Sequence, residues 1–147
     1  MRYGYPARIG GEEGDWVVTF RDVPEALTGD ETMEGARALA QDCLIAALGF
    51  YTDPKWGGPR PIPRPSRPEP DEEMVDLPPL VAAKLALHEA VREAGLTEVA
   101  LAGRLGVTEA AARRLLDLDH RSHIGEVERA LALLGKRLVV EVLEAAA

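Results

Sequence analysis

The side chains that could do chemistry in the first third of this chain are carboxylates. Five acids lie close together, next to the expected start of a long helix: Asp22, Glu25, Asp30, Glu31 and Glu34. Hydrolysis through bound metal ions needs several converging ligands, and no histidine or pair of metal-ligand spacings accompanies these acids. The helix dipole by itself favours acids at a helix start. We therefore expect no catalytic residue, no metal site, no cofactor and no enzymatic activity.

The single cysteine and the three histidines lead to the same expectation. Cys43 lies on the apolar face of that helix without an activating base, which is typical of a small buried hydrophobic residue. One cysteine cannot form an internal disulfide, and this favours a reducing cytoplasm. His120 and His123 flank a predicted turn, where contact with phosphate is the alternative to a structural role in the loop. One cysteine and three scattered histidines exclude a usual zinc site.

The second half has a different chemistry, because its arginines cluster around two short helices. Thr97 and Thr108 are each positioned to cap a helix, and Gly106 to end the first helix in a tight turn. Ala102 is small where the two helices would approach each other. Three apolar residues would bury the second helix: Val107, Ala112 and Leu115. Two short helices joined by a turn that contains glycine predict a helix-turn-helix; the alternative is a purely structural helical bundle.

In a helix-turn-helix, the second of these helices would enter the major groove of DNA. We expect Glu109 to accept a hydrogen bond from cytosine and Arg114 to bind guanine. Arg113 and Arg121 would hold phosphates, helped by backbone amides at the two helix starts. The predicted DNA-binding residues are Thr97, Arg104, Thr108, Glu109, Ala110, Arg113, Arg114 and Arg121.

Further elements flank the helix pair. Pro78 and Pro79 are placed to open a helix that stops at Gly95, and another helix is expected over 124–134. The segment 138–142 is predicted to be a terminal strand that pairs with its copy in a two-fold dimer. The predicted dimerisation residues are Leu131, Leu134, Leu138, Val140 and Val142.

The first half has the pattern of a small α+β unit. Apolar residues alternate with other types over 2–9, and 16–20 is rich in β-branched and aromatic residues, so a hairpin is predicted across the glycine-rich turn at 10–15. Pro6 suggests an edge or a strand end. A short third strand over 26–30, a helix capped by Thr32 and a last strand over 72–77 complete the unit.

Nine of the eleven prolines lie between Asp53 and Pro79. Proline fixes φ and removes a backbone donor, so the segment 57–65 cannot be a helix or a central strand. We expect an extended, semi-rigid connector over 53–70, with a polyproline ligand for a partner domain as the alternative.

Length and charge set the organisation of the chain. Its 147 residues permit one ordinary domain or two small ones. Residues 1–76 carry 15 acids and 8 bases, a net charge of −7, whereas residues 77–147 carry 10 acids and 9 bases, a net charge of −1. An acidic unit repels nucleic acid and attracts basic partners. Without a membrane-spanning run or a signal-peptide core, we expect a cytoplasmic protein with no membrane partner.

Three stretches, in their order, resemble the HicB antitoxins of bacterial toxin–antitoxin systems. The first is the segment 14–30, with a glycine, an aromatic strand, an Asp-x-Pro motif at Asp22 and a Thr-Gly-acid motif at Thr28, followed by an alanine-rich helix. The second is the proline-rich segment that contains Pro63, Pro65 and Ser66. The third, 95–115, is similar to the Cro/repressor class of helix-turn-helix. Together they cover nearly the whole chain.

The resemblance implies a domain over 1–76 with a partial RNase H-like fold without working catalytic residues. This domain would bind a small HicA toxin, an mRNA interferase, and shield its catalytic histidine. The domain over 77–147 would dimerise, with a tetramer as a further possibility, bind operator DNA and repress the toxin–antitoxin operon. Acids are the candidates for contact with the basic toxin: Glu12, Glu13, Asp15, Asp22 and Glu25. The alternative function is a transcription regulator whose first domain senses a small molecule or another protein.

Overall fold

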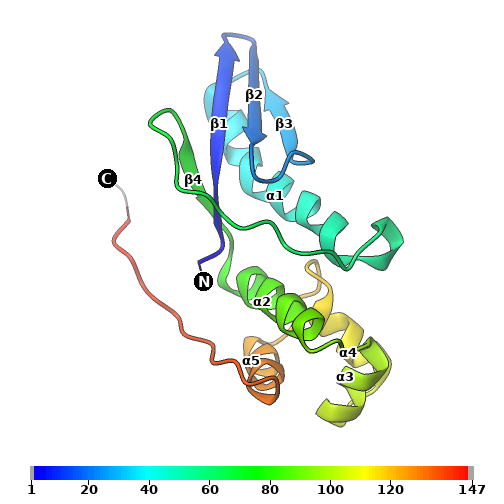
Figure 1. Ribbon diagram of the computed structural model, residues 1–147. Helices are drawn as coiled ribbons and strands as arrows, with labels where there is room; N and C mark the ends of the chain where they lie inside the picture. Colours follow the sequence, from blue (N-terminus) through cyan, green and yellow to red (C-terminus); the bar gives the residue numbers. More distant parts are fainter. Residues whose placement is uncertain (1, 146–147) are drawn as a thin grey trace.

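The first half of the chain forms an antiparallel sheet with one long helix against it, and the second half is helical (Figure 1). This computed structural model describes residues 2–145. Its α+β class agrees with the prediction. The elements in chain order are β1 (Gly4–Glu12), β2 (Asp15–Phe20), β3 (Leu27–Asp30), α1 (Met33–Thr52), the 3-10 helix η1 (Pro54–Trp56), β4 (Glu73–Asp76), α2 (Pro79–Glu93), α3 (Glu98–Leu105), α4 (Glu109–Leu116) and α5 (Ile124–Leu133).

The sheet has the strand order β3-β2-β1-β4, and all its neighbours are antiparallel. The predicted alternation in β1 is confirmed only in part, since Tyr5 and Ala7 are buried and Arg8 is exposed, but Gly4 and Pro6, expected on the outer face, are buried as well. β1 is a central strand, but at Pro6 it pairs only with β4, because β2 pairs with it from Ala7 onward. A proline is tolerated there because one side of the strand has no ladder to complete.

Helix α1 begins where its cap predicts. The Thr32 hydroxyl accepts a hydrogen bond from the backbone N–H of Gly35 at 3.0 Å, which satisfies one of the free donors at the helix start. Small and branched apolar residues at three- and four-residue spacing then bury one face of the helix against the sheet: Ala36, Ala40, Leu44, Ala47 and Leu48.

The proline-rich segment is fixed along its length to the first half of the protein. Ile62 is buried in the same core as the sheet, and the Tyr5 hydroxyl donates to the carbonyl of Pro63 at 2.8 Å. The backbone N–H and the hydroxyl of Ser66 both donate to the carboxylate of Asp22 at 2.7 Å. The segment is extended, as predicted for a connector, but it runs back along the sheet to β4.

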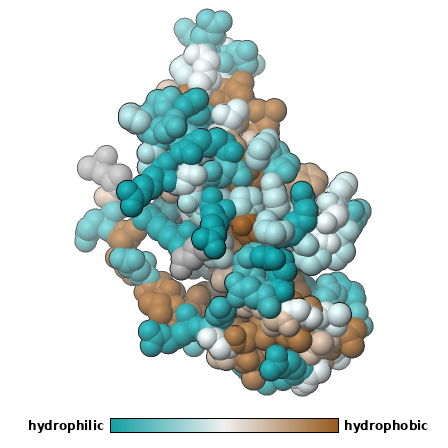
Figure 2. All heavy atoms as spheres, viewed as in Figure 1, coloured by the Kyte–Doolittle hydropathy of each residue, from teal (hydrophilic) through white to brown (hydrophobic). Residues whose placement is uncertain are grey.

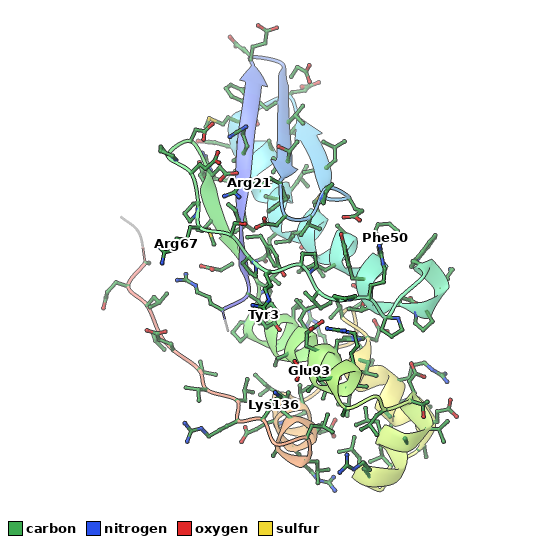
Figure 3. The ribbon with its side chains drawn as sticks, viewed as in Figure 1. Tyr3, Arg21, Phe50, Arg67, Glu93 and Lys136 are labelled. Atoms are coloured by element: carbon green, nitrogen blue, oxygen red, sulfur yellow. The ribbon has the colours of Figure 1, made fainter. Side chains whose placement is uncertain are left out.

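A second group of contacts fixes the end of this segment beside β1. The guanidinium of Arg21 pairs with Glu72 at 3.0 Å and donates to the carbonyl of Arg67. Figure 3 shows Arg21 in front of the strands and Arg67 beside β4, whereas α1 lies behind the sheet (Figures 1 and 3). The proline-rich segment therefore covers part of the sheet face that α1 leaves open.

Helix α2 belongs to two apolar cores. Val81 and Leu85 pack into the core of the sheet and α1, together with Leu118 from beyond α4. Leu87 and Val91, further along α2, pack into a second core with α3, α4 and α5. The expected boundary after residue 76 is therefore followed at once by a helix that is buried against both halves, rather than by a flexible joint.

The segment 138–142 runs extended without a backbone partner within residues 2–145, so it is no strand in the single chain, and its pairing with a second copy stays a prediction. One expectation for the second half is wrong. Val107 is not buried under α4; it lies in the turn after Gly106 with 37% of its surface exposed. The buried residues of α4 are instead Ala112, Leu115 and Leu116.

Among the described residues, no helix combines the length and the apolar character that crossing a membrane requires.

Candidate functional site

The α3–α4 pair has the caps and the turn that its sequence predicts. The Thr97 hydroxyl accepts from the N–H of Ala100, and the Thr108 hydroxyl from that of Ala111, each at 3.1 Å. Gly106 adopts φ +68°, the left-handed conformation that favours glycine after a helix. The start of α4 is therefore fixed on both sides, by its own cap and by the turn before it.

The outward face of α4 is the predicted one. Glu109, Ala110, Arg113 and Arg114 are all exposed, while the opposite face is buried. Arg113 is not free, because it pairs with Glu98 at 3.3 Å and with Glu109 at 3.4 Å. An exposed pair of this kind contributes at most about 1 kcal/mol and can exchange for a phosphate.

Three other arginines around this face have unpaired guanidinium groups. Arg104 on α3, Arg114 on α4 and Arg121 in the following loop are exposed, and none of them donates to another group within the described chain. They are free cations on a half of the protein whose acids and bases nearly balance. Such side chains are available to a polyanion.

The sequence analysis missed Lys84, the residue that fixes the far end of α4. Its ammonium group is fully buried, and its three N–H donors face four acceptors at 2.6–2.9 Å, the carbonyls of Arg114, Asp117 and His120 and the hydroxyl of Ser122. The carbonyls of Arg114 and Asp117 lie at the C-terminal end of α4, where a cation is favourable, and each accepts a further hydrogen bond, from the Ser122 hydroxyl and the His120 N–H respectively. Burial lowers the pKa of Lys84. No spacing rule marks a lysine within an apolar helix face as a helix cap.

The histidines have structural roles in this region. His88, one turn after Lys84, is buried, with its Nε2 only 2.6 Å from the carbonyl oxygen of Leu116. His120 contacts the Ser122 hydroxyl at 3.1 Å, and His123 caps α5 by accepting from the N–H of Gly125 at 3.3 Å. The two loop histidines therefore already have partners within the protein.

The predicted toxin-binding acids form two separate groups. Glu12, Glu13 and Asp15 lie at the tip of the β1–β2 hairpin, exposed and in no ion pair among the described residues (Figure 1). Asp22 and Glu25 lie beyond the other end of β2. The two groups are separated by the length of that strand, roughly 3.4 Å per residue, so they do not form one patch.

Asp22 and Glu25 also have internal partners. Asp22 is half-buried and accepts both hydrogen bonds from Ser66. Glu25 accepts a hydrogen bond from the Tyr51 hydroxyl at 2.8 Å, and burial followed by this bond raises the pKa of Tyr51 to about 12. The hairpin acids are the ones of this set that are free to meet a partner.

Cys43 is half-buried between α1 and β3, and burial raises the pKa of its thiol. This agrees with the interpretation as a small hydrophobic residue. Within residues 2–145, no three His, Cys, Asp or Glu side chains come close enough together to hold a metal ion.

The five predicted dimerisation residues are divided between the core and the tail. Leu131 is buried in the second core, and Leu134 and Leu138 pack against it. Val140 and Val142 are exposed by 63% and 92% on the extended tail. Lys136 pairs with Glu93 of α2 at 3.2 Å and fixes the start of this tail, as Figure 3 shows. Grooves of about 530 Å³ and 480 Å³ flank the tail, partly lined by it.

Comparison with known proteins assigns this architecture to a class. The sequence model described as "HicB_like antitoxin of bacterial toxin-antitoxin system" matches residues 4–86, which include the sheet, α1 and the first part of α2. The class is therefore that of antitoxins from bacterial toxin–antitoxin systems.

Proteins named as antitoxins are similar in sequence to most of this chain. The chain is 37% identical over 134 residues to Antitoxin HicB 2 of Photorhabdus laumondii, covering 91% of this chain and 92% of the relative. It is 36% identical over 126 residues to Antitoxin HicB of Escherichia coli K12, covering 86% and 88%. To Antitoxin HicB of Pseudomonas fluorescens it is 36% identical over 143 residues, covering 97% and 95%. The chain belongs to the HicB-like antitoxin family, whose named members are antitoxins and not enzymes.

Proposed function

We propose that this antitoxin neutralises a small, basic HicA-like mRNA interferase through its first half, a partial RNase H-like domain. We further propose that it represses its own operon by binding operator DNA through α3 and α4 as a helix-turn-helix. The observation that carries this proposal is the separation of free charges. Unpaired acids lie on the hairpin tip, and the unpaired arginines Arg104, Arg114 and Arg121 lie around α4.

For DNA binding, the proposal relies on the geometry of α4. The helix has an exposed outer face, a capped start and a far end fixed by Lys84, which are the conditions for presenting side chains to a major groove. Glu109 and Arg114 would read bases, while Arg104, Arg113 and Arg121 and the amides near Thr97 and Thr108 would bind phosphates.

A domain with a net charge of −1 needs more than one DNA contact surface to bind firmly. We therefore include a two-fold dimer, or a tetramer built from dimers, in the proposal. The exposed Val140 and Val142 on an unpaired extended segment favour pairing with the same segment of a second copy. Two half-sites about one helical turn of DNA apart would follow.

The experiment uses the full chain and two arms. In the first arm, the product of a short gene adjacent to that of this chain, where it encodes a small basic protein, is co-purified with the antitoxin and tested for RNA cleavage with and without it. In the second arm, a duplex from the upstream region is titrated in a mobility-shift assay. Loss of either binding event in the wild type would remove the corresponding half of the proposal.

Matched arginine variants sharpen the second arm. We expect Arg114→Ala to lose about 1–3 kcal/mol of the binding free energy that distinguishes the bases at a single position of the operator. Arg121→Ala should weaken binding to all DNA sequences alike and reduce the salt dependence of the binding constant. Arg137→Ala, on the tail away from α4, is the control that leaves base discrimination unchanged. If Arg114→Ala and Arg137→Ala discriminate bases equally well, α4 does not read DNA in this way.

A regulator that senses a small molecule is the second candidate function. A hollow of about 330 Å³ lies between the end of α1 and α4, lined by Thr52, Asp53, His88, Glu98 and Arg113 among others. It joins the two halves next to the proposed DNA-reading helix. A wild-type chain that binds its operator but no neighbouring basic protein would favour this second function.

A further inference from the structure

The sheet face away from α1 is covered over only part of its width. Two ion-pair groups hold the end of the proline-rich segment against β1 and the end of β2: Arg8 with Glu69 and Asp71, and Arg21 with Glu72. Within residues 2–145, no helix or loop packs over the same face of β2 and β3 (Figure 1). One half of this sheet face is therefore open.

The strand register identifies the residues on the open half. Val17 lies opposite Gly10 on one side and Gly29 on the other, and Thr19 lies opposite Leu27. Val18 and Phe20 point into the core, so Val17 and Thr19 point away from it. We call Gly10, Val17, Thr19, Leu27 and Gly29 the open sheet face.

Two apolar side chains form the centre of this face. Leu27 is 64% exposed and Val17 is 37% exposed. Figure 2 views the molecule from this side and shows brown, hydrophobic atoms below the teal tip of the β1–β2 hairpin. Beside Thr19 a hollow of about 290 Å³ is lined by Arg8, Arg21 and Pro24 among others, large enough to receive a side chain of a partner.

Gly10 makes the open sheet face flat at a position where the fold does not need glycine. Its φ is not in the left-handed region, and a Cβ atom added there would meet no atom within 4 Å. Glycine inside a strand is unfavourable for the strand itself, and it often marks a place where another backbone approaches closely. Gly10 thus gives a second, independent indication of a partner on this face.

The charges around the face indicate the sign of that partner. Glu12, Glu13 and Asp15 lie at one end, and within residues 2–145 they form no ion pair, whereas Glu25 beyond the other end is bonded to Tyr51 of α1. The basic residues of the same face, Arg8 and Arg21, are neutralised by the acids of the proline-rich segment. The hairpin end of the rim is therefore acidic, next to an apolar centre.

We propose that the open sheet face is the docking surface for a basic protein that brings an apolar patch to Val17 and Leu27 and cations to the hairpin acids. This inference rests on the proposed function, because the partner would be the toxin, and it adds the surface to which the toxin binds. An apolar centre within a charged rim is the arrangement in which a few central side chains dominate affinity and the rim charges speed association.

The experiment measures binding of the neighbouring basic protein to the full-length antitoxin by calorimetry. Leu27→Lys and Val17→Lys put a cation on the exposed face without touching the core, and we expect each to weaken binding about tenfold or more. Gly10→Val fills open space with a residue that strands favour; it should keep or raise the melting temperature while weakening binding. Leu39→Lys, on the exposed side of α1, is the matched control and should bind like the wild type.

The outcomes separate this inference from the proposed function. If the wild type binds and the three face variants bind as tightly as Leu39→Lys, the docking surface is elsewhere and the inference is overturned, while the antitoxin function stands. If the wild type does not bind the neighbouring protein at all, the proposed function fails and the inference fails with it. Weakened binding by Gly10→Val with an unchanged fold supports the inference most directly.

Discussion

At the scale of single residues, the buried polar groups of α2 control how α4 is held. The Nε2 of His88 lies 2.6 Å from a carbonyl oxygen, which can only accept, so Nε2 carries the proton. Burial is the largest influence on this ring and lowers its pKa below the usual 6.5. The neutral form is therefore the one that the folded protein selects.

The lowered pKa of His88 predicts how the free energy of unfolding depends on pH. The unfolded chain takes up a proton at His88 near pH 6.5, but the folded protein does so only at lower pH. Below pH 6.5 the unfolded state therefore binds more protons, and the free energy of unfolding should fall as the pH drops. Urea denaturation between about pH 7.5 and 5.5 should show a decrease of up to about 1.4 kcal/mol per pH unit.

His88→Gln is the control, because its amide can still donate to Leu116 but does not titrate. The pH range stays above the region where Glu72 and Glu73 contribute, since ion pairs hold their pKa values below 4.5. A decrease of the same size in His88→Gln would assign the effect to other groups.

At the scale of elements, the structure depends on side chains that join segments far apart in the sequence. Local signals located the elements themselves: Thr32, Thr97 and Thr108 cap helices as predicted, and Gly106 ends one. The two hydrogen bonds from Ser66 to Asp22, which we call the staple, were not predictable, because nothing in the local sequence indicates which segment returns to a half-buried carboxylate. The segment 138–142 is no strand within the single chain, because its β-branched residues show only propensity, whereas a strand also needs a neighbour.

The staple predicts that Asp22 acts through the proline-rich segment. Asp22→Ala removes the acceptor of two hydrogen bonds from Ser66 and should lower the free energy of unfolding by about 1–3 kcal/mol. Ser66→Ala removes only the hydroxyl bond and should lower it by about 1 kcal/mol. Asp15→Ala, exposed at the hairpin tip, should change it by less than about 0.5 kcal/mol. Chemical denaturation measures all three; equal stabilities of Asp22→Ala and Asp15→Ala would contradict the staple.

Lys84 joins α2 to the end of α4 and allows a second test at this scale. Lys84→Met keeps the apolar stem but removes the charged donor from three carbonyls that each retain only one neutral donor, so the free energy of unfolding should fall by about 1–3 kcal/mol. Operator affinity should fall as well, since the far end of α4 loses its support. Lys55→Met, on the exposed η1, is the control and should alter neither quantity. Unchanged stability in Lys84→Met would show that α4 is held by apolar packing alone.

At the scale of the whole molecule, the two halves form one connected body with unequal charges. The first half carries nearly all the negative charge, yet its core includes Val81, Leu85 and Leu118 from the second half. A fragment that ends at residue 76 would lack these side chains, so tests of toxin binding belong on the full chain.

The tail after Gly135 carries the last prediction, which concerns assembly. A chain that ends at Gly135 retains Val127, Ala130 and Leu131 in the second core, and loses the Lys136–Glu93 pair and the packing of Leu138. It should therefore remain folded. We expect light scattering to show a dimer or a larger assembly for the full chain and a monomer for the truncated chain.

The functional result of the truncation follows from the symmetry of the complex. A single copy with a nearly neutral DNA-binding half would contact one half-site, so operator affinity should fall at least about tenfold, whereas binding of the basic partner to the sheet should be unchanged. Val142→Lys in the full chain keeps the backbone available for pairing and should have a smaller effect than truncation. A truncated chain that stays dimeric, or a monomer with full operator affinity, would show that neither the tail nor the dimer contributes to operator binding as proposed.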